Sequence, residues 1–205
     1  MSGPALSIGD ECDDSAASLG RLFDEAIRVY AAAFSPPPYS DPGRGEEVRQ
    51  RVREVHSARE GFLGFIAVDD SRGRVLGMIY GYHGKPGQWW HDAVVRAVDR
   101  DTASRWFGDS YELVEVAVDP AFQGHGVGQK LIDALLEGRN EATCVLSTRT
   151  DSRAHLLYRR LGFEVITEMR FSPSGAPFYV MGRPLPYEAS GTLDPEEEEA
   201  GTAAR

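Results

Sequence analysis

Residues 111–129 read Tyr-Glu-Leu-Val-Glu-Val-Ala-Val-Asp-Pro-Ala-Phe-Gln-Gly-His-Gly-Val-Gly-Gln. The apolar first part predicts a strand, the glycine-rich part predicts a turn, and the amphipathic pattern that follows predicts a helix over roughly 127–138. Gly124, Gly126 and Gly128 let successive backbone N–H groups turn toward an anion at the positive end of that helix. The stretch therefore predicts a phosphate cradle, and a pyrophosphate is the natural ligand.

Two common nucleotide-binding motifs do not fit this turn. A dinucleotide-binding fingerprint requires Gly-x-Gly-x-x-Gly with an acidic residue about 20 residues further on. The spacing here is Gln123-x-x-Gly126-x-Gly128. A P-loop requires Gly-Lys-Ser/Thr, but Gly128 is followed by Gln129 and Lys130. Both nucleotide interpretations therefore fail.

The spacing Gln123-x-x-Gly126-x-Gly128 resembles the Gln/Arg-x-x-Gly-x-Gly/Ala signature of the GNAT N-acetyltransferase superfamily, in which this loop holds the pyrophosphate of acetyl-coenzyme A. Residues 154–163, Ala-His-Leu-Leu-Tyr-Arg-Arg-Leu-Gly-Phe, resemble the Ala-x-x-Leu-Tyr-x-x-x-Gly-Phe segment of the same superfamily. The predicted helix and a short predicted strand lie between the two motifs, in the order that the family requires. The resemblance implies acetyl-coenzyme A as the cosubstrate.

The whole chain fits one domain of this fold. With 205 residues, of which 41% are hydrophobic, it is long enough for a single sizeable core. The resemblance implies an α/β (α+β) fold with a mixed, mostly antiparallel sheet of about six to seven strands and about four helices, in which strands 111–118 and 142–149 splay apart to bind coenzyme A. Periodicity predicts helices over roughly 17–34, 44–59 and 92–100, and strands over roughly 62–68, 75–82, 163–171 and 177–184.

The net charge of the chain argues against one class of binding partner. A net charge of −10 argues against nucleic acid, because phosphate binding needs a basic surface. Half of that charge lies in residues 186–205, where a run of four glutamates stands among Pro, Gly, Ser and Thr. Such a segment buries too little apolar area to fold. We therefore expect an acetyltransferase domain over residues 1–185, followed by a disordered acidic tail.

Hydropathy and cysteine usage predict the compartment. The sequence has no apolar run of about 18 residues and no basic-then-apolar leader, so no membrane span or signal peptide is expected and a cytoplasmic location is predicted. The two cysteines, Cys12 and Cys144, are far apart and have no metal-ligand spacing. This pattern predicts unpaired thiols and no bound metal.

The resemblance also implies catalytic residues for direct attack of an amine on the thioester. Tyr158 matches the tyrosine that in many members lies near the sulfur and protonates the departing thiolate. Glu112 falls where many members have a glutamate that takes the amine proton, and Glu115 is the second candidate. Because these glutamates are three positions apart, only one is expected to face the cleft unless a bulge intervenes. The alternatives are a structural ion pair for either glutamate and an ordinary helix-face residue for Tyr158.

Coenzyme binding is expected to use backbone groups. In the family, groups near Val116 and Val118 bond the pantetheine amides and polarise the thioester carbonyl. His125 stands where members often have Arg or Lys beside the phosphates. The predicted coenzyme-binding residues are Val116, Ala117, Val118, Gln123, Gly124, His125, Gly126, Val127, Gly128 and Tyr158.

The acceptor is expected to meet the most variable parts of the fold. Residues 83–109 are longer than a connection needs, and their Trp89 and Trp90 would either form an apolar lid over the substrate, together with Phe34, or pin the insertion to the core. The final segment has a modest likeness to antibiotic-modifying, puromycin-type members. A small-molecule primary amine is therefore the predicted acceptor.

Two other functions stay open at this point. The first is acetylation of a lysine side chain or an N-terminal amine of a protein, and the second is an acyl-coenzyme-A-binding sensor without turnover. Homodimers are frequent in the family, and the final strands are candidate contact edges.

Overall fold

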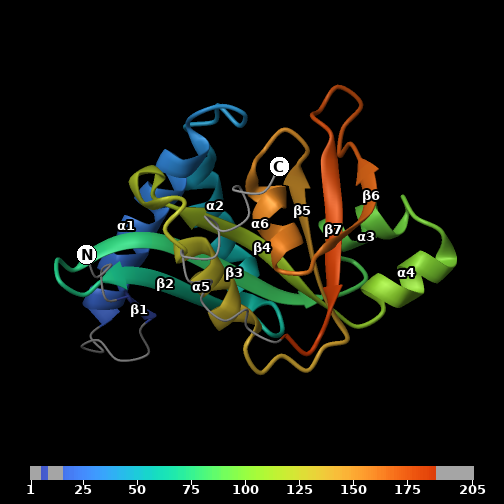
Figure 1. The fold of residues 1–205 in the computed structure, drawn as a ribbon, viewed down its shortest axis with the longest axis horizontal. Coiled ribbons are helices and arrows are strands. Elements are labelled where there is room, and N and C mark those ends of the chain that lie inside the picture. The colour runs from blue at the N-terminus through green and yellow to red at the C-terminus, as the bar shows by residue number, and fades with distance from the viewer. Residues whose placement is uncertain (1–5, 9–15, 188–205) are drawn as a thin grey trace, which may run out of the picture.

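A seven-stranded sheet forms the centre of the computed structural model, which describes residues 6–8 and 16–187 (Figure 1). The strand order is β1-β2-β3-β4-β5-β7-β6, and only the β4–β5 pair is parallel. The predicted mixed, mostly antiparallel sheet is therefore confirmed. The strands are β1 Leu6–Ile8, β2 Leu63–Asp69, β3 Arg74–Gly84, β4 Ser110–Val118, β5 Thr143–Arg149, β6 Glu164–Met169 and β7 Phe178–Pro184.

Six α-helices flank the sheet in the described part of the chain, rather than about four. They are α1 Ala16–Phe34, α2 Arg44–Glu54, α3 Trp89–Val95, α4 Arg100–Phe107, α5 Val127–Leu136 and α6 Ala154–Arg160. The helices α5 and α6 lie in front of the sheet in the view of Figure 1. The apolar side chains of α1 and α2 pack with β3 in a separate cluster, and those of α3 and α4 pack with β5 and β7 in a third.

Two helix predictions were wrong in their bounds. The single helix predicted around 92–100 is two helices, because the carboxylate of Asp99 accepts hydrogen bonds from the backbone amides of Asp101 and Thr102 and so begins α4. The helix predicted over 44–59 ends at Glu54. A short 3-10 helix, His56–Ala58, follows, and its His56 side chain is buried against Tyr80 and Tyr82.

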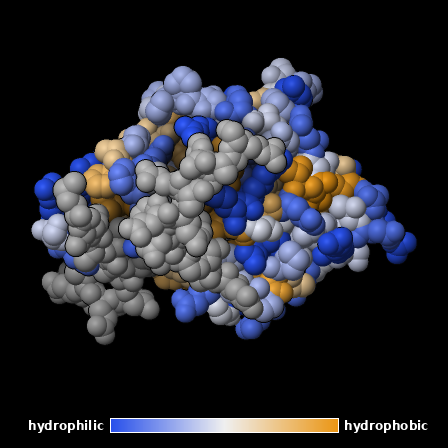
Figure 2. Space-filling model, viewed as in Figure 1, coloured by the Kyte–Doolittle hydropathy of each residue, from blue (hydrophilic) through white to orange (hydrophobic). Residues whose placement is uncertain are grey.

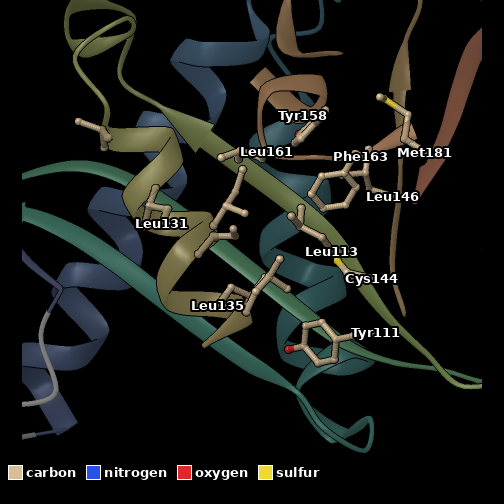
Figure 3. Packing of buried hydrophobic residues seen from close by; sticks show 14 of the residues in the cluster. Tyr111, Leu113, Leu131, Leu135, Cys144, Leu146, Tyr158, Leu161, Phe163 and Met181 are labelled. Atoms are coloured by element: carbon tan, nitrogen blue, oxygen red, sulfur yellow. The ribbon is translucent and has the colours of Figure 1, made fainter. Parts of the chain in front are cut away.

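The main core lies between α5, α6 and the sheet. Leu131 and Leu135 of α5 and Tyr111 and Leu113 of β4 are all buried in this core (Figure 3). The amphipathic pattern after the glycine turn thus fixes α5 against the strand that precedes it. This packing places the glycine loop, residues 123–126, beside the end of β4.

A bulge interrupts β4 in the middle of the quoted stretch. Across the β3–β4 pair, Tyr80 lies opposite Glu115 but Gly81 lies opposite Leu113, so Val114 is the extra residue. The extra residue turns Glu112 and Glu115 to the same face of the sheet, the face covered by α1 and α2. The exception allowed for in the sequence, a bulge between the two glutamates, is therefore present.

The last strand of the sheet is open on one side. β6 is an edge strand, and Val165 on it is 37% exposed. Figure 2 shows hydrophobic residues reaching the surface in this region. The homodimer contact predicted at the final strands stays a prediction.

Two predictions about the chain ends concern residues that the structure does not describe. Most of the predicted tail (residues 188–205 of 186–205) and Cys12 lie beyond the described residues. Among the residues that the structure describes, no helix has the length and apolarity needed to cross a membrane.

The bulge leaves no room for a side chain at Gly81, which gives a test of the register. A Cβ atom there would meet the carbonyl oxygen of Glu112 at 2.5 Å and the Tyr111 ring at 2.6 Å, whereas one at Gly20 in α1 would meet nothing within 4 Å. We expect Gly81→Ala to lower the free energy of unfolding by about 2 kcal/mol or more. The matched control Gly20→Ala should leave it unchanged or raise it by up to about 1 kcal/mol. Urea denaturation of both variants measures this, and equal stabilities would contradict the register.

Candidate active site

The strands β4 and β5 part soon after they begin. They pair only from Ser110 to Glu112 with Thr143 to Val145, although β5 stays paired with β7 along its whole length. Residues 113–118 of β4 and 146–149 of β5 therefore border an opening in the middle of the sheet, which we call the seam. The predicted splayed strand pair is confirmed.

The backbone groups of Val116 and Val118 face the seam. The amide of Asp119 donates to the carbonyl of Leu76 on β3 at 2.8 Å. Because alternate residues of a strand direct their N–H and C=O groups to opposite edges, Ala117 also bonds toward β3, while Val116 and Val118 point away from it. An extended amide chain laid into the seam would find these groups unpaired with β5.

The glycine loop has the backbone shape expected of a phosphate cradle. Gly124 and Gly126 have positive φ angles of 80° and 79°, and a Cβ atom at either would meet nothing within 4 Å. Gly126 is the N-cap of α5 and no side chain caps that helix, so its first amides remain directed at the loop. The loop and the helix end therefore fit an anionic group.

The other residues of this motif hold the loop to the seam. The Gln123 side-chain amide donates to the carbonyl of Val118 at 3.1 Å, and the exposed His125 ring lies 3.0 Å from the Gln123 carbonyl. A Cβ atom at Gly128 would lie 3.3 Å from the Leu157 side chain of α6. The last glycine thus lets α5 pack closely against the helix that carries Tyr158.

Tyr158 is buried beside the seam. Its ring packs edge-on against Phe163, with ring centroids 5.8 Å apart. Burial raises the pKa of Tyr158, and the charges of Tyr39 and Glu115 raise it further. Because Glu115 and Tyr39 belong to the opposite face of the sheet, this influence reaches Tyr158 across the seam.

Glu115 is buried and has several partners. Its carboxylate accepts a hydrogen bond from Tyr30 and forms ion pairs with the guanidinium groups of Arg44, at 3.6 Å, and Arg51, at 3.8 Å. Burial raises the pKa of Glu115, and these partners oppose the rise. The geometry is that of a structural ion pair.

Glu112 is also buried but has fewer partners. It accepts a hydrogen bond from Tyr82, and among the described residues its Oε2 atom has none. Burial raises the pKa of Glu112 to about 8, with Arg59 and Tyr82 lowering it and Glu115 raising it. A carboxyl group that titrates near neutral pH, next to the point where the strands part, can exchange a proton with a neighbouring ligand.

The three residues predicted to contact the acceptor differ in their burial and in their contacts. The Trp90 indole N–H donates to the Ser147 hydroxyl of β5 at 3.0 Å, which pins the insertion to the strand that borders the seam. Trp89 is 66% exposed and contacts Phe171, with ring centroids 5.4 Å apart. Phe34 is buried under Tyr39. The structure thus joins Trp90 to the seam and leaves Trp89 on the surface.

Four residues near the site were not predicted from the sequence. Tyr82 is the partner of Glu112, Arg44 is the partner of Glu115, and Tyr39 lies between Arg44 and Arg149. Tyr82 could have been found, because it lies on the strand next to Glu112. The other three come from α2, the segment before it and β5, and only the tertiary fold brings them together.

The prediction of no bound metal stays a prediction. Cys144 is a buried free thiol. Within the part of the chain that the structure describes, no group of three or more His, Cys, Asp or Glu residues is placed to hold a metal ion.

Comparison with known proteins agrees with this geometry. The family model of the acetyltransferase (GNAT) domain matches residues 60–165 of this chain. The GCN5-like protein acetyltransferase Rv2170 of Mycobacterium tuberculosis is 39% identical over 191 residues, which cover 81% of this chain and 93% of that protein. A mycothiol acetyltransferase of Propionibacterium freudenreichii is 30% identical over 156 residues, covering 74% of this chain and 43% of that protein.

One similar solved structure contains acetyl-CoA. The crystal structure of a GNAT family acetyltransferase from Brucella melitensis in complex with acetyl-CoA has a TM-score of 0.51 and 26% sequence identity, and covers 90% of this chain and 93% of that one. The chain belongs to the GNAT family of acetyltransferases, and it is an acyltransferase.

The backbone conformation of Gly126 can be tested against a matched glycine. Gly138, just beyond the other end of α5, also has a positive φ, of 67°, and open space around it. Alanine at either position should cost about 1 kcal/mol of stability, but only Gly126→Ala should weaken acetyl-coenzyme A binding, by about tenfold. Calorimetric titration measures this, and equal affinities would contradict the cradle.

The burial of Glu112 predicts a dependence of stability on pH. Its pKa is about 8 in the folded chain and near 4.5 when exposed, so the stability it contributes is complete below about pH 4.5 and is lost as the pH rises through about 8. Between pH 5 and 8 the free energy of unfolding should therefore fall relative to that of Glu112→Gln, by an amount on the order of a few kcal/mol. The exposed control Glu168→Gln should follow the wild type, and parallel curves for Glu112→Gln would contradict the prediction.

Proposed function

We propose that this chain transfers an acetyl group from acetyl-coenzyme A to a primary amine by direct attack, with Glu112 as the general base and Tyr158 as the proton donor. The observation that carries the proposal is the position of Glu112. It is a buried carboxyl group with an uncommitted oxygen, next to the point where the strands part.

The properties of Glu112 suit proton removal from an amine. An alkylammonium group must lose a proton before it can attack a thioester, and a base with a pKa near the working pH is most effective. Burial raises the pKa of Glu112 to about 8, which brings it into this range. Glu115 suits the task less well, because Arg44 and Tyr30 already occupy its carboxylate.

The other groups at the seam would bind the coenzyme and protonate its departing thiolate. The backbone amides at Val116 and Val118 can bond the pantetheine arm and the thioester carbonyl, where negative charge develops. A phenol is protonated at neutral pH, so the Tyr158 hydroxyl beside the seam would protonate the departing thiolate. Gly124, Gly126 and the first turn of α5 would hold the pyrophosphate.

For the acceptor, we infer an amine carried by a protein. The support is the 39% identity to a relative that is named a protein acetyltransferase and is matched over 93% of its length. The small-molecule amine predicted from the sequence is the second candidate. It is supported by the 30% identity to a relative whose name specifies mycothiol rather than a protein.

Release of free thiol from acetyl-coenzyme A tests the reaction. Suitable acceptors are a lysine peptide with a blocked N-terminus, a lysine-free peptide with an open N-terminus, and a panel of aminoglycosides, puromycin-like nucleosides and simple amines. We expect kcat/KM for a peptide to rise with pH and to show a midpoint near the Glu112 pKa of about 8. Glu112→Gln should lose that limb, and Glu112→Gln and Tyr158→Phe should each lower kcat by more than about tenfold.

The outcomes separate the candidates. Turnover of small amines alone would replace the protein acceptor by the second candidate. An unchanged pH profile in Glu112→Gln would contradict its role as the base. Binding of acetyl-coenzyme A without thiol release from any acceptor would contradict the proposed transfer and favour a sensor.

A further inference from the structure

Tyr82 lies beside Glu112 in the sheet. The two residues are directly opposite each other in the β3–β4 pair, so their side chains stand on the same face. The Tyr82 hydroxyl donates a hydrogen bond to the Glu112 carboxylate. Because the Oε2 atom of Glu112 has no hydrogen-bond partner among the described residues, this bond is made to the other oxygen. One oxygen of the carboxyl group is thus held, and the second is free.

The ring of Tyr82 is itself held by two neighbouring side chains. The His56 ring meets it edge-on, with ring centroids 5.2 Å apart, and the Arg59 guanidinium lies over it, 4.5 Å from the ring centroid. The Nδ1 atom of His56 lies 3.1 Å from the hydroxyl of Tyr80. The backbone amide of Arg59 donates to the carbonyl of His56 at 3.0 Å, which closes the short 3-10 helix. These contacts fix the Tyr82 ring and the direction of its hydroxyl.

Most titratable groups around Glu112 are neutral. Burial lowers the pKa of His56 to about 4, so its ring is uncharged near pH 7. Phenols and thiols are protonated at this pH, and burial raises the pKa of those near Glu112 further. They are Tyr80 and Tyr82 of β3 and Cys144 of β5. None of these groups carries a charge that could act on Glu112.

Two charged groups act on Glu112 in opposite directions. Burial has the largest effect on the pKa of Glu112 and raises it, the Arg59 guanidinium lowers it, and the Glu115 carboxylate raises it. Glu115 is paired with Arg44 at 3.6 Å and with Arg51 at 3.8 Å. The cation that favours the charged form of Glu112 is therefore Arg59, which follows the 3-10 helix.

We propose that Tyr82 and Arg59 are positioning residues for the general base: the Tyr82 hydroxyl holds one oxygen of Glu112 so that Oε2 meets the amine, and Arg59 on the Tyr82 ring favours the carboxylate. The inference rests on the proposed function, in which Glu112 is the base. During the transfer an N–H bond of the ammonium group breaks and an O–H bond forms at Oε2. Tyr82 keeps its own proton and Arg59 keeps its charge.

The first test needs no acceptor. The side-chain carboxyl carbon of Glu112 is followed by NMR against pH in protein labelled with ¹³C-glutamate, and Glu112→Gln assigns the signal. The midpoint is expected near pH 8 in the wild type. Tyr82→Phe removes a hydrogen bond to the charged form and Arg59→Gln removes a nearby cation, so each should raise the midpoint by about one pH unit. Arg59→Lys keeps the cation and should keep the wild-type midpoint.

Two matched controls separate positioning from packing. Tyr80→Phe removes the same hydroxyl from the same strand and face, where its partner is His56. Arg53→Gln removes a guanidinium that pairs with Asp24 and lies over the Phe23 ring. Both controls should leave the Glu112 midpoint where it is in the wild type. Unmoved midpoints in Tyr82→Phe and Arg59→Gln, or equal shifts in the controls, would overturn the positioning role.

The second test is kinetic and uses the peptide and amine probes named above. The midpoint of kcat/KM against pH should rise in Tyr82→Phe and Arg59→Gln as it does by NMR. Above the midpoint, Tyr82→Phe should still have a kcat about tenfold below that of the wild type, because the free oxygen is no longer directed at the amine. Arg59→Gln should regain the wild-type kcat there, because only the charge has changed.

The outcomes are distinguishable from failure of the proposed function. Absence of turnover in the wild type would defeat that function, and with it the positioning of a base, even if the NMR midpoints move. Turnover in the wild type, with a pH profile and a high-pH kcat that Tyr82→Phe leaves unchanged, would overturn the role of Tyr82 alone. Failure of Arg59→Lys to restore the midpoint would overturn the role of the Arg59 charge.

Discussion

A central strand that loses its neighbour halfway along its length leaves backbone N–H and C=O groups without partners. In this chain the loss occurs after Glu112, where β5 stays with β7 and leaves β4. Buried backbone groups are nearly always paired, so such an opening favours a ligand that supplies amides of its own. Everything else at the site is arranged around this opening: the glycine loop at its end, Tyr158 on one face, and the two glutamates on the other.

The bulge at Val114 decides how the two glutamates divide their tasks. Without it, one of them would point to the core beneath α5. With it, both lie on the face of α1 and α2, where Glu115 is bound by Arg44 and Tyr30 and Glu112 keeps an uncommitted oxygen. Two similar side chains in one strand thus have different chemistry, because their neighbours differ.

The sequence predicted the parts of the site that depend on local conformation. Gly124 and Gly126 have positive φ angles, a conformation that can be predicted from the glycines of the loop alone. The helix α5 can be predicted as well, because its apolar residues recur at helical spacing. The Ala154–Phe163 motif likewise placed Tyr158 on a helix beside the seam. Fold class and family were therefore within reach of pattern and resemblance.

What the sequence did not predict depends on contacts between distant segments. The bulge is visible only in the register of β3 against β4, and the position of Tyr39 results from Arg44 and Arg149, which are 105 residues apart. The second helix of the insertion was missed because its start depends on the cap at Asp99. These features cannot be recognised from the sequence, because they depend on which side chains the fold brings into contact.

The measurement that tests the central claim most directly is hydrogen exchange at single-residue resolution on β4, with and without acetyl-coenzyme A. The account predicts that the coenzyme slows exchange at the amides of Val116 and Val118, which face the seam, and leaves the amides already bonded to β3 as they were. Slowed exchange elsewhere, with Val116 and Val118 unchanged, would contradict the claim that the seam receives the coenzyme.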